Sequence, residues 1–194
     1  SLKCSISVFV NPEINHKMKK ILMLIALITS IQLHAQQTYS VTMNGIGPFK
    51  LNMKKAEVEK ILGKEIKLQN LLKEAWNYDT LTYAYNTVPF TFVFDRQSVD
   101  DKNYDIVLRE VKISNSNFKT PSGITIGDDK MKIVNTYEAY TIWIIPDYEN
   151  GYTSRSKTNT SVWVQGDDTG NVIIFHLYMN KVESISVTWN ENYD

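Results

Sequence analysis

FKLNMKKAEV, residues 49–58, is echoed later in the chain by ITIGDDKMKI, residues 124–133. Each copy consists of a short apolar alternation, a polar turn residue and a charged helix start with apolar side chains at helical spacing. A glycine lies upstream of both copies, Gly47 before the first and Gly123 before the second. Internal repetition indicates the architecture of a chain, because each copy marks one structural unit. The repeat carries no nucleophile, metal-ligand cluster or phosphate-binding loop, so it leaves the chemistry open.

The same order of secondary structure is predicted after each copy. In the first half, a helix is expected between Asn52, a residue type that often caps helix N-termini, and Gly63, which favours a helix end. In the second half, the helix begins at Asp128-Asp129, where negative charge favours an N-terminus, and reaches Tyr140. Apolar alternation predicts strands near residues 81–85, 90–94, 104–113, 141–145, 162–164, 172–178 and 182–189, with polar loops at 95–103 and 147–159.

This order predicts the α+β class, as a tandem repeat of two helix-plus-antiparallel-sheet units. We place the first unit at residues 36–118 and the second at residues 119–194. The β-α-β alternation of a parallel sheet is not seen. The part of the chain after residue 35 is long enough for one sizeable core, or for two small cores that share an interface.

The N-terminal part of the chain is typical of a secretory signal peptide. Met18-Lys19-Lys20 supplies the positive start, the apolar run 21–33 is shorter than the roughly 20 residues that span a bilayer, and Ala35 supplies the small residue at a cleavage site. We therefore interpret residues 1–17 as a non-native upstream extension and residues 18–35 as the signal peptide. The prediction is an exported, soluble protein of the periplasm or the secretome, with no integral membrane span after cleavage. A retained membrane anchor is the alternative.

Cysteine and charge content exclude several classes of protein. The single cysteine, Cys4, lies in the excluded part, so the mature chain has no disulfide, no thiol nucleophile and no lipid-attachment cysteine. We therefore predict that it is not a lipoprotein. The mature part is slightly acidic, which argues against nucleic acid as a partner, because nucleic-acid-binding proteins usually carry a basic patch.

The sequence around the first predicted helix resembles that of a known superfamily. The resemblance consists of an apolar turn containing glycine, the helix start at residues 53–58, the helix end at Ile61-Leu62-Gly63 and the strand at 90–94. This superfamily contains the secreted β-lactamase inhibitor protein and the small lipoprotein of the outer-membrane barrel-assembly machine. The resemblance covers most of residues 40–190. It implies helices packed on an antiparallel sheet, in two tandem copies in the inhibitor branch. The second copy departs from the pattern, because no glycine ends its helix, and the lipoprotein branch needs a cysteine where this chain has Gln36. No inhibitory residue can be carried across.

The candidate catalytic and metal-binding residues are better explained by structure. His176 alternates with the apolar residues of its strand, which favours a histidine on a sheet surface, and one histidine cannot build a typical zinc site. The acidic pairs lack the spacing of a calcium loop and are explained by helix starts and turns; they are Asp100-Asp101, Asp128-Asp129 and Asp167-Asp168. We therefore predict no catalytic residue, no metal site and no cofactor.

Aromatic residues are more numerous than a core of this size needs. Because strand side chains alternate between two faces, some of these rings are expected to lie on an outer face, and such a face is a usual basis for contact with proteins or sugars. The alternative is that the core absorbs all of them. If a binding site exists, we expect it on a concave sheet face near Tyr83, Tyr85, Trp163 and Tyr178.

These observations predict a non-enzymatic protein-interaction module of the cell envelope or secretome, with an inhibitory or assembly-related role and an envelope or secreted protein as its partner. One alternative is a small-ligand binding protein that takes up a lipid, glycan or peptide in a deep apolar pocket. A minority alternative is a hydrolase that uses His176.

Overall fold

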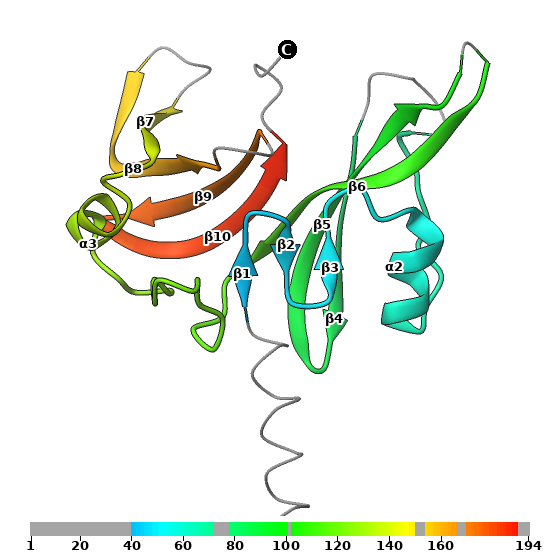
Figure 1. The fold of residues 1–194 in the computed structure, drawn as a ribbon, viewed down its shortest axis with the longest axis horizontal. Helices are drawn as coiled ribbons and strands as arrows, with labels where there is room; N and C mark the ends of the chain where they lie inside the picture. Colours follow the sequence, from blue (N-terminus) through cyan, green and yellow to red (C-terminus); the bar gives the residue numbers. More distant parts are fainter. Residues whose placement is uncertain (1–39, 72–77, 101, 150–153, 167–169, 190–194) are drawn as a thin grey trace, which may run out of the picture. The chain divides into compact units, whose positions relative to one another are not determined.

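The computed structural model describes residues 40–71, 78–100, 102–149, 154–166 and 170–189 (Figure 1). Tyr39–Asp194 forms one compact unit by itself. The expected upstream extension, signal peptide and cleavage site lie outside the described residues. Among the described residues, no helix is long and apolar enough to cross a membrane.

A seven-stranded antiparallel sheet dominates this unit. Its strands are β4 (Asp79–Tyr85), β5 (Val88–Ser98), β6 (Tyr104–Ile113), β7 (Thr141–Glu149), β8 (Ser154–Gln165), β9 (Asn171–Tyr178) and β10 (Lys181–Trp189). The strand order is β4-β5-β6-β10-β9-β8-β7, and every neighbouring pair is antiparallel. A smaller sheet contains β1 (Val41–Thr42), β2 (Gly45–Ile46) and β3 (Phe49–Lys50), and the described helices are α2 (Lys55–Leu62) and α3 (Lys130–Thr136).

The predicted α+β tandem repeat is wrong. The structure is mostly β: the described part has two helices, of eight and seven residues, and strands from both halves of the chain form one sheet, because β6 pairs directly with β10. The prediction gave too much weight to the helices and made the strands too short. β5 extends into the expected loop 95–103 as far as Ser98, and β7 and β8 extend into the expected loop 147–159. These extensions are polar, so no apolar alternation marks them.

The two copies of the sequence motif do share a local backbone structure. Asn52 and Gly127 occupy corresponding positions and both have positive φ, 66° and 88°. The Asn52 N–H donates to the Leu108 carbonyl at 2.9 Å, and the Gly127 N–H donates to the Val182 carbonyl at 2.7 Å. The same two strand residues also donate: the Leu108 N–H donates to the Met53 carbonyl at 2.8 Å, and the Val182 N–H donates to the Asp128 carbonyl at 2.9 Å. The repeated sequence motif therefore corresponds to the hydrogen-bonded segment that joins each short helix to the large sheet.

The helix boundaries agree in part with the prediction. Gly63 adopts φ 64° and ends α2, as expected from its freedom to enter the left-handed region. Asn52 is not the N-cap: α2 begins after Lys54, whose N–H donates to the Glu57 carboxylate at 2.7 Å. Asp129 caps α3 by accepting a hydrogen bond from the Met131 N–H at 2.9 Å. Each helix is therefore stabilised locally at its start by a carboxylate.

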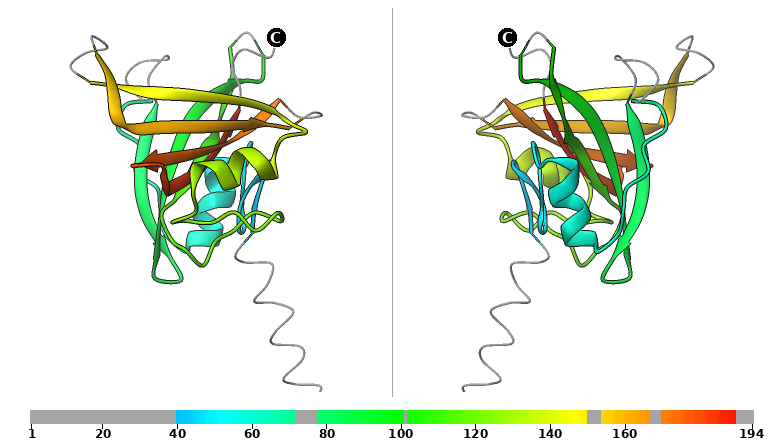
Figure 2. Two further views of the ribbon diagram at one scale, coloured as in Figure 1. Left: turned by 90° about the vertical axis from the view of Figure 1, so that its left-hand side faces the viewer. Right: turned by 90° about the vertical axis from the view of Figure 1, so that its right-hand side faces the viewer.

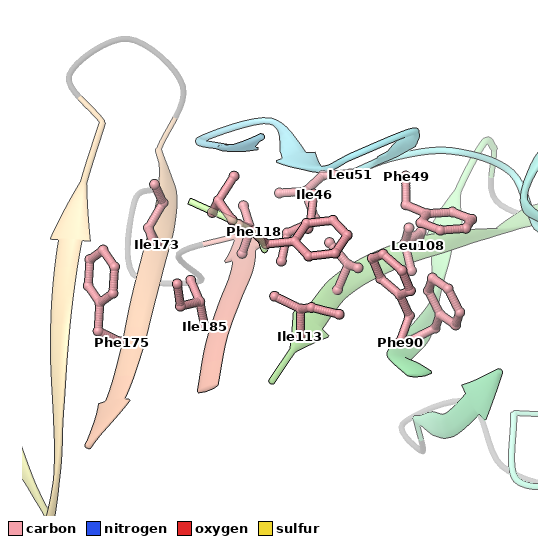
Figure 3. Packing of buried hydrophobic residues seen from close by; sticks show 14 of the residues in the cluster. Ile46, Phe49, Leu51, Phe90, Leu108, Ile113, Phe118, Ile173, Phe175 and Ile185 are labelled. Carbon is pink, nitrogen blue, oxygen red and sulfur yellow. The ribbon is translucent and has the colours of Figure 1, made fainter. Parts of the chain in front are cut away.

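The core lies on one side of the large sheet. β1, β2, β3, α2 and α3 all lie on that side (Figure 2). Figure 3 shows buried side chains of β3 and of the sheet pointing toward one another. The Phe49 ring lies 5.0 Å from the Phe90 ring and 4.8 Å from the Phe92 ring, in edge-to-face geometry. These phenylalanines are fully buried, so their packing provides much of the apolar stabilisation of this unit.

Candidate functional site

The other side of the large sheet, which we call the open face, has no described helix or strand over it (Figure 2). Strand register and side-chain alternation place polar and aromatic residues there. From β6 to β7, the open-face residues are Glu110 and Lys112 of β6, Ser184, Ser186 and Thr188 of β10, Val172, Ile174, His176 and Tyr178 of β9, Ser161, Trp163 and Gln165 of β8, and Thr141, Trp143 and Ile145 of β7. The side chains at the centre of this face are buried, including those of Ser184, Ser186 and Thr188. The face therefore has hydroxyl groups along the central strand β10 and tryptophans toward the β7 edge.

A polar cluster lies at the centre of the open face. The His176 Nε2 atom lies 3.0 Å from the Ser186 hydroxyl, and the Glu110 carboxyl is also hydrogen-bonded to Ser186. Ser186 is fully buried, whereas His176 and Glu110 are half-buried. Through this serine, the cluster connects the side chains of β6, β10 and β9.

Burial shifts both titratable groups of the cluster toward their neutral forms. Burial, aided by the positive charge of Lys112, lowers the pKa of His176 to about 4, so the imidazole is neutral at neutral pH. Burial raises the pKa of Glu110, against the opposing effects of the Ser186 hydrogen bond and of the charges on Lys112 and Arg109. A neutral imidazole can both accept and donate a hydrogen bond, which suits contact with a polar ligand group.

The cluster does not have the geometry of a serine hydrolase. In such an enzyme the acid orients the imidazole, which in turn activates an accessible serine. Here Glu110 is bonded to Ser186, and the Ser186 side chain has no exposed surface for an incoming carbonyl group. The arrangement fits a role in holding the open face together.

Two tryptophans lie at the β7 end of the open face, and the ring of one of them, Trp163, is held by a hydrogen bond. Trp163 donates from Nε1 to the Ser161 hydroxyl at 3.0 Å, and Ser161 donates to the Ile145 carbonyl at 3.3 Å. Trp143 lies directly opposite Trp163 in the β7–β8 register and is 38% exposed. A hydrogen-bonded ring loses little conformational freedom when a partner covers it.

The four residues predicted to form a site are not brought together. Tyr83 and Tyr85 lie on the core side of β4, where both pack against the core and the Tyr85 ring is 5.3 Å from that of Phe49. Trp163 is half-buried on the open face, where Tyr178 is 47% exposed. Alternation shows which residues of one strand share a face, but it does not show which face of that strand is covered.

The open-face residues that sequence reasoning missed include Trp143, Ser186 and Glu110. A signal for Ser186 was present, because hydroxyl residues at 184, 186 and 188 alternate with apolar residues in β10. That alternation indicates one polar and one apolar face. Nothing in the sequence alone places Glu110 beside it, since the β6–β10 pairing joins distant segments.

The acidic residues form no metal site in the described part of the chain, where no group of three or more His, Cys, Asp or Glu side chains is suitably placed. Asp100 accepts hydrogen bonds from the backbone N–H groups of Lys102 and Asn103, which explains it as a turn residue. Asp101, Asp167 and Asp168 lie outside the described residues.

Comparison of the chain with known protein families, with curated proteins and with solved structures finds no match.

Proposed function

We propose that the chain is an exported, non-enzymatic protein-interaction module of the cell envelope or secretome, and that it binds its partner on the open face. The observation that carries this proposal is a sheet face without a described covering layer that presents Trp143, Trp163 and Tyr178. Tryptophan and tyrosine are enriched among the residues that dominate binding energy at protein interfaces. An inhibitory or assembly role fits such a surface and agrees with the resemblance described above.

The chemistry next to these rings also favours a protein partner. The half-buried His176 imidazole and Glu110 carboxyl, which are bonded to Ser186, lie in the same face as the tryptophans. Protein interfaces combine apolar anchors with polar groups in this way. Export is supported by the basic and then apolar sequence at residues 18–35.

The small-ligand alternative calls for a deep apolar pocket. The space between β3 and the large sheet is filled by the rings of Phe49, Phe90 and Phe92, whose centroids are about 5 to 6 Å apart. A lipid or glycan would have to enter elsewhere. The arrangement of the described core therefore favours the protein-interaction proposal.

An affinity capture with matched variants tests the proposal. The chain from residue 36 onward, which contains the compact unit Tyr39–Asp194, serves as bait against envelope and secreted fractions of the native cell. The test variant is Trp163→Ala/Tyr178→Ala. The control is Val99→Ala/Met179→Ala, which truncates two other exposed apolar side chains that are 62% and 60% exposed.

We expect a protein that is retained by the wild type and by the control and is lost with the test variant. With that protein purified, the test variant should weaken the affinity by at least about thirtyfold, the effect of removing one strong anchor. Circular dichroism of both variants checks that they fold. Retention that is equally strong on the test variant would show that the open face is not the binding surface.

A further inference from the structure

The seven-stranded sheet ends in two edges of different character. At one end, β4 exposes Thr80, Thr82 and Ala84. At the other end, β7 exposes large apolar side chains on both faces of the sheet: Trp143 is 38% exposed, Ile144 46% and Ile145 37%. A strand edge presents free backbone N–H and C=O groups, and proteins usually protect it with charges, proline or bulges.

In β7, the features that prevent pairing with another strand come only after its apolar residues. Pro146 and a register irregularity between Pro146 and Tyr148 interrupt the second half of the strand. The preceding stretch, Thr141 to Ile145, contains no charged residue and pairs in regular register with β8 on its inner side. In the described part of the chain, no strand pairs with its outer side. This stretch is therefore a short, uncharged pairing edge with a defined end.

We propose that this edge pairs with the same edge of a second copy of the chain. Antiparallel pairing of residues 141–145 about a two-fold axis through Trp143 places Ile142 opposite Ile144 of the second copy and Thr141 opposite Ile145 of the second copy. In each pair the two residue numbers differ by two or four, so both side chains belong to the same face of β7. The pairing therefore joins core side to core side and open face to open face. Trp143 then lies opposite Trp143 of the second copy on the open face. Such a self-complementary contact closes as a dimer.

Charge and surface chemistry favour a second copy as the occupant. Like charges opposite one another destabilise a strand pair, and this segment has none. The chain from residue 36 onward has 17 basic and 20 acidic side chains, so the long-range repulsion between two copies is weak. Ile144 is exposed on the core side, while Trp143 and Ile145 are exposed on the open side. An identical edge covers both sides with matching apolar residues.

Sedimentation velocity over micromolar concentrations tests this inference, with the chain from residue 36 onward. We expect a dimer for the wild type and a monomer for Ile144→Lys, because a charge on an edge strand opposes pairing. Val99→Lys, at a site that is 62% exposed and outside β7, should dimerise like the wild type. A wild-type monomer at all concentrations, or a dimer that persists in Ile144→Lys, would overturn the inference.

Cross-linking tests the register. The chain from residue 36 onward has no cysteine, so introduced cysteines are its sole thiols. With dissolved oxygen and a copper catalyst as the oxidant, a mixture of Thr141→Cys and Ile145→Cys proteins should form a mixed disulfide about a thousandfold faster than either protein forms its own disulfide, because pairing raises the effective thiol concentration from micromolar to millimolar. Equal rates for the mixture and the separate proteins would refute the two-fold register. This result would leave the open-face proposal intact, since that test changes Trp163 and Tyr178.

Discussion

Acidification should destabilise the protein through His176. The imidazole has a pKa of about 4 in the folded chain and an ordinary value of 6.5, so between these pH values the unfolded chain binds a proton that the folded chain does not. Stability therefore falls as pH falls from 6.5 to 4. A difference of about 2.5 pKa units corresponds to a loss of at most about 3 kcal/mol, since the ring keeps some contact with solvent.

The variant His176→Gln isolates this effect. Glutamine can keep a hydrogen bond to Ser186 but cannot take up the proton. Glu110 has the opposite influence: its raised pKa means that the folded chain binds a proton more readily, so its contribution to stability falls as pH rises from 4.5 toward its folded pKa. Because both proteins contain Glu110, subtracting their free energies of unfolding leaves the contribution of His176.

Urea denaturation at several pH values between 4 and 7.5 gives those free energies. We expect the wild type to lose up to about 3 kcal/mol relative to His176→Gln across this range, with most of the change below pH 6.5. The imidazole signals in NMR spectra report the pKa directly and are assigned by their loss in the variant. A parallel pH dependence of the two proteins, or an imidazole that titrates near 6.5, would refute the reasoning.

Two further pairs of variants, each compared by urea denaturation, test the close backbone approach at Gly45 and the buried carboxylate of Asp79. A methyl group at Gly45, where φ is 144°, would lie 2.1 Å from a backbone oxygen, so Gly45→Ala should lower the free energy of unfolding by more than about 2 kcal/mol. The control Gly123→Ala also has a positive φ, 82°, but no atom lies within 4 Å of the added methyl group, so it should lower the free energy of unfolding by about 1 kcal/mol. The buried Asp79 carboxylate accepts hydrogen bonds from the N–H groups of residues 69–71, so Asp79→Asn should lower the free energy of unfolding by about 2 kcal/mol. The control Asp147→Asn changes an exposed carboxylate and should leave the free energy of unfolding nearly unchanged. Equal losses within either pair would contradict the corresponding explanation.

The sequence predicted strands well where one face is buried. The alternation of Phe90, Phe92 and Phe94 marks β5 because these side chains lie against the core while their neighbours do not. The same rule failed for the outer parts of the hairpins, at residues 95–98, 147–148 and 154–159, which belong to paired strands but have little apolar burial. Backbone pairing leaves no periodic signal in the side chains.

The four residues of the predicted binding site are divided between two sheet faces for a different reason. Tyr83 and Trp163 each belong to an alternating strand, but one lies on the covered face and the other on the open face. The choice depends on which side receives β1–β3 and the two helices, and therefore on contacts between segments far apart in sequence. A local pattern cannot supply that information, nor could it show that β6 and β10 join the halves into one sheet.

The two proposed interaction surfaces meet at Trp143, which belongs both to the open face and to the β7 edge. Pairing of two β7 strands would place the open faces of both copies side by side in one continuous sheet, with neighbouring strands about 4.8 Å apart. A partner with two matching sites could then bind both copies, and its apparent affinity would exceed that for one. Ile144→Lys would lower that affinity although Ile144 lies on the core side, whereas Trp163→Ala would weaken binding to each copy separately. Comparing these variants against a monovalent and a bivalent form of the partner would therefore show whether the edge and the open face act together.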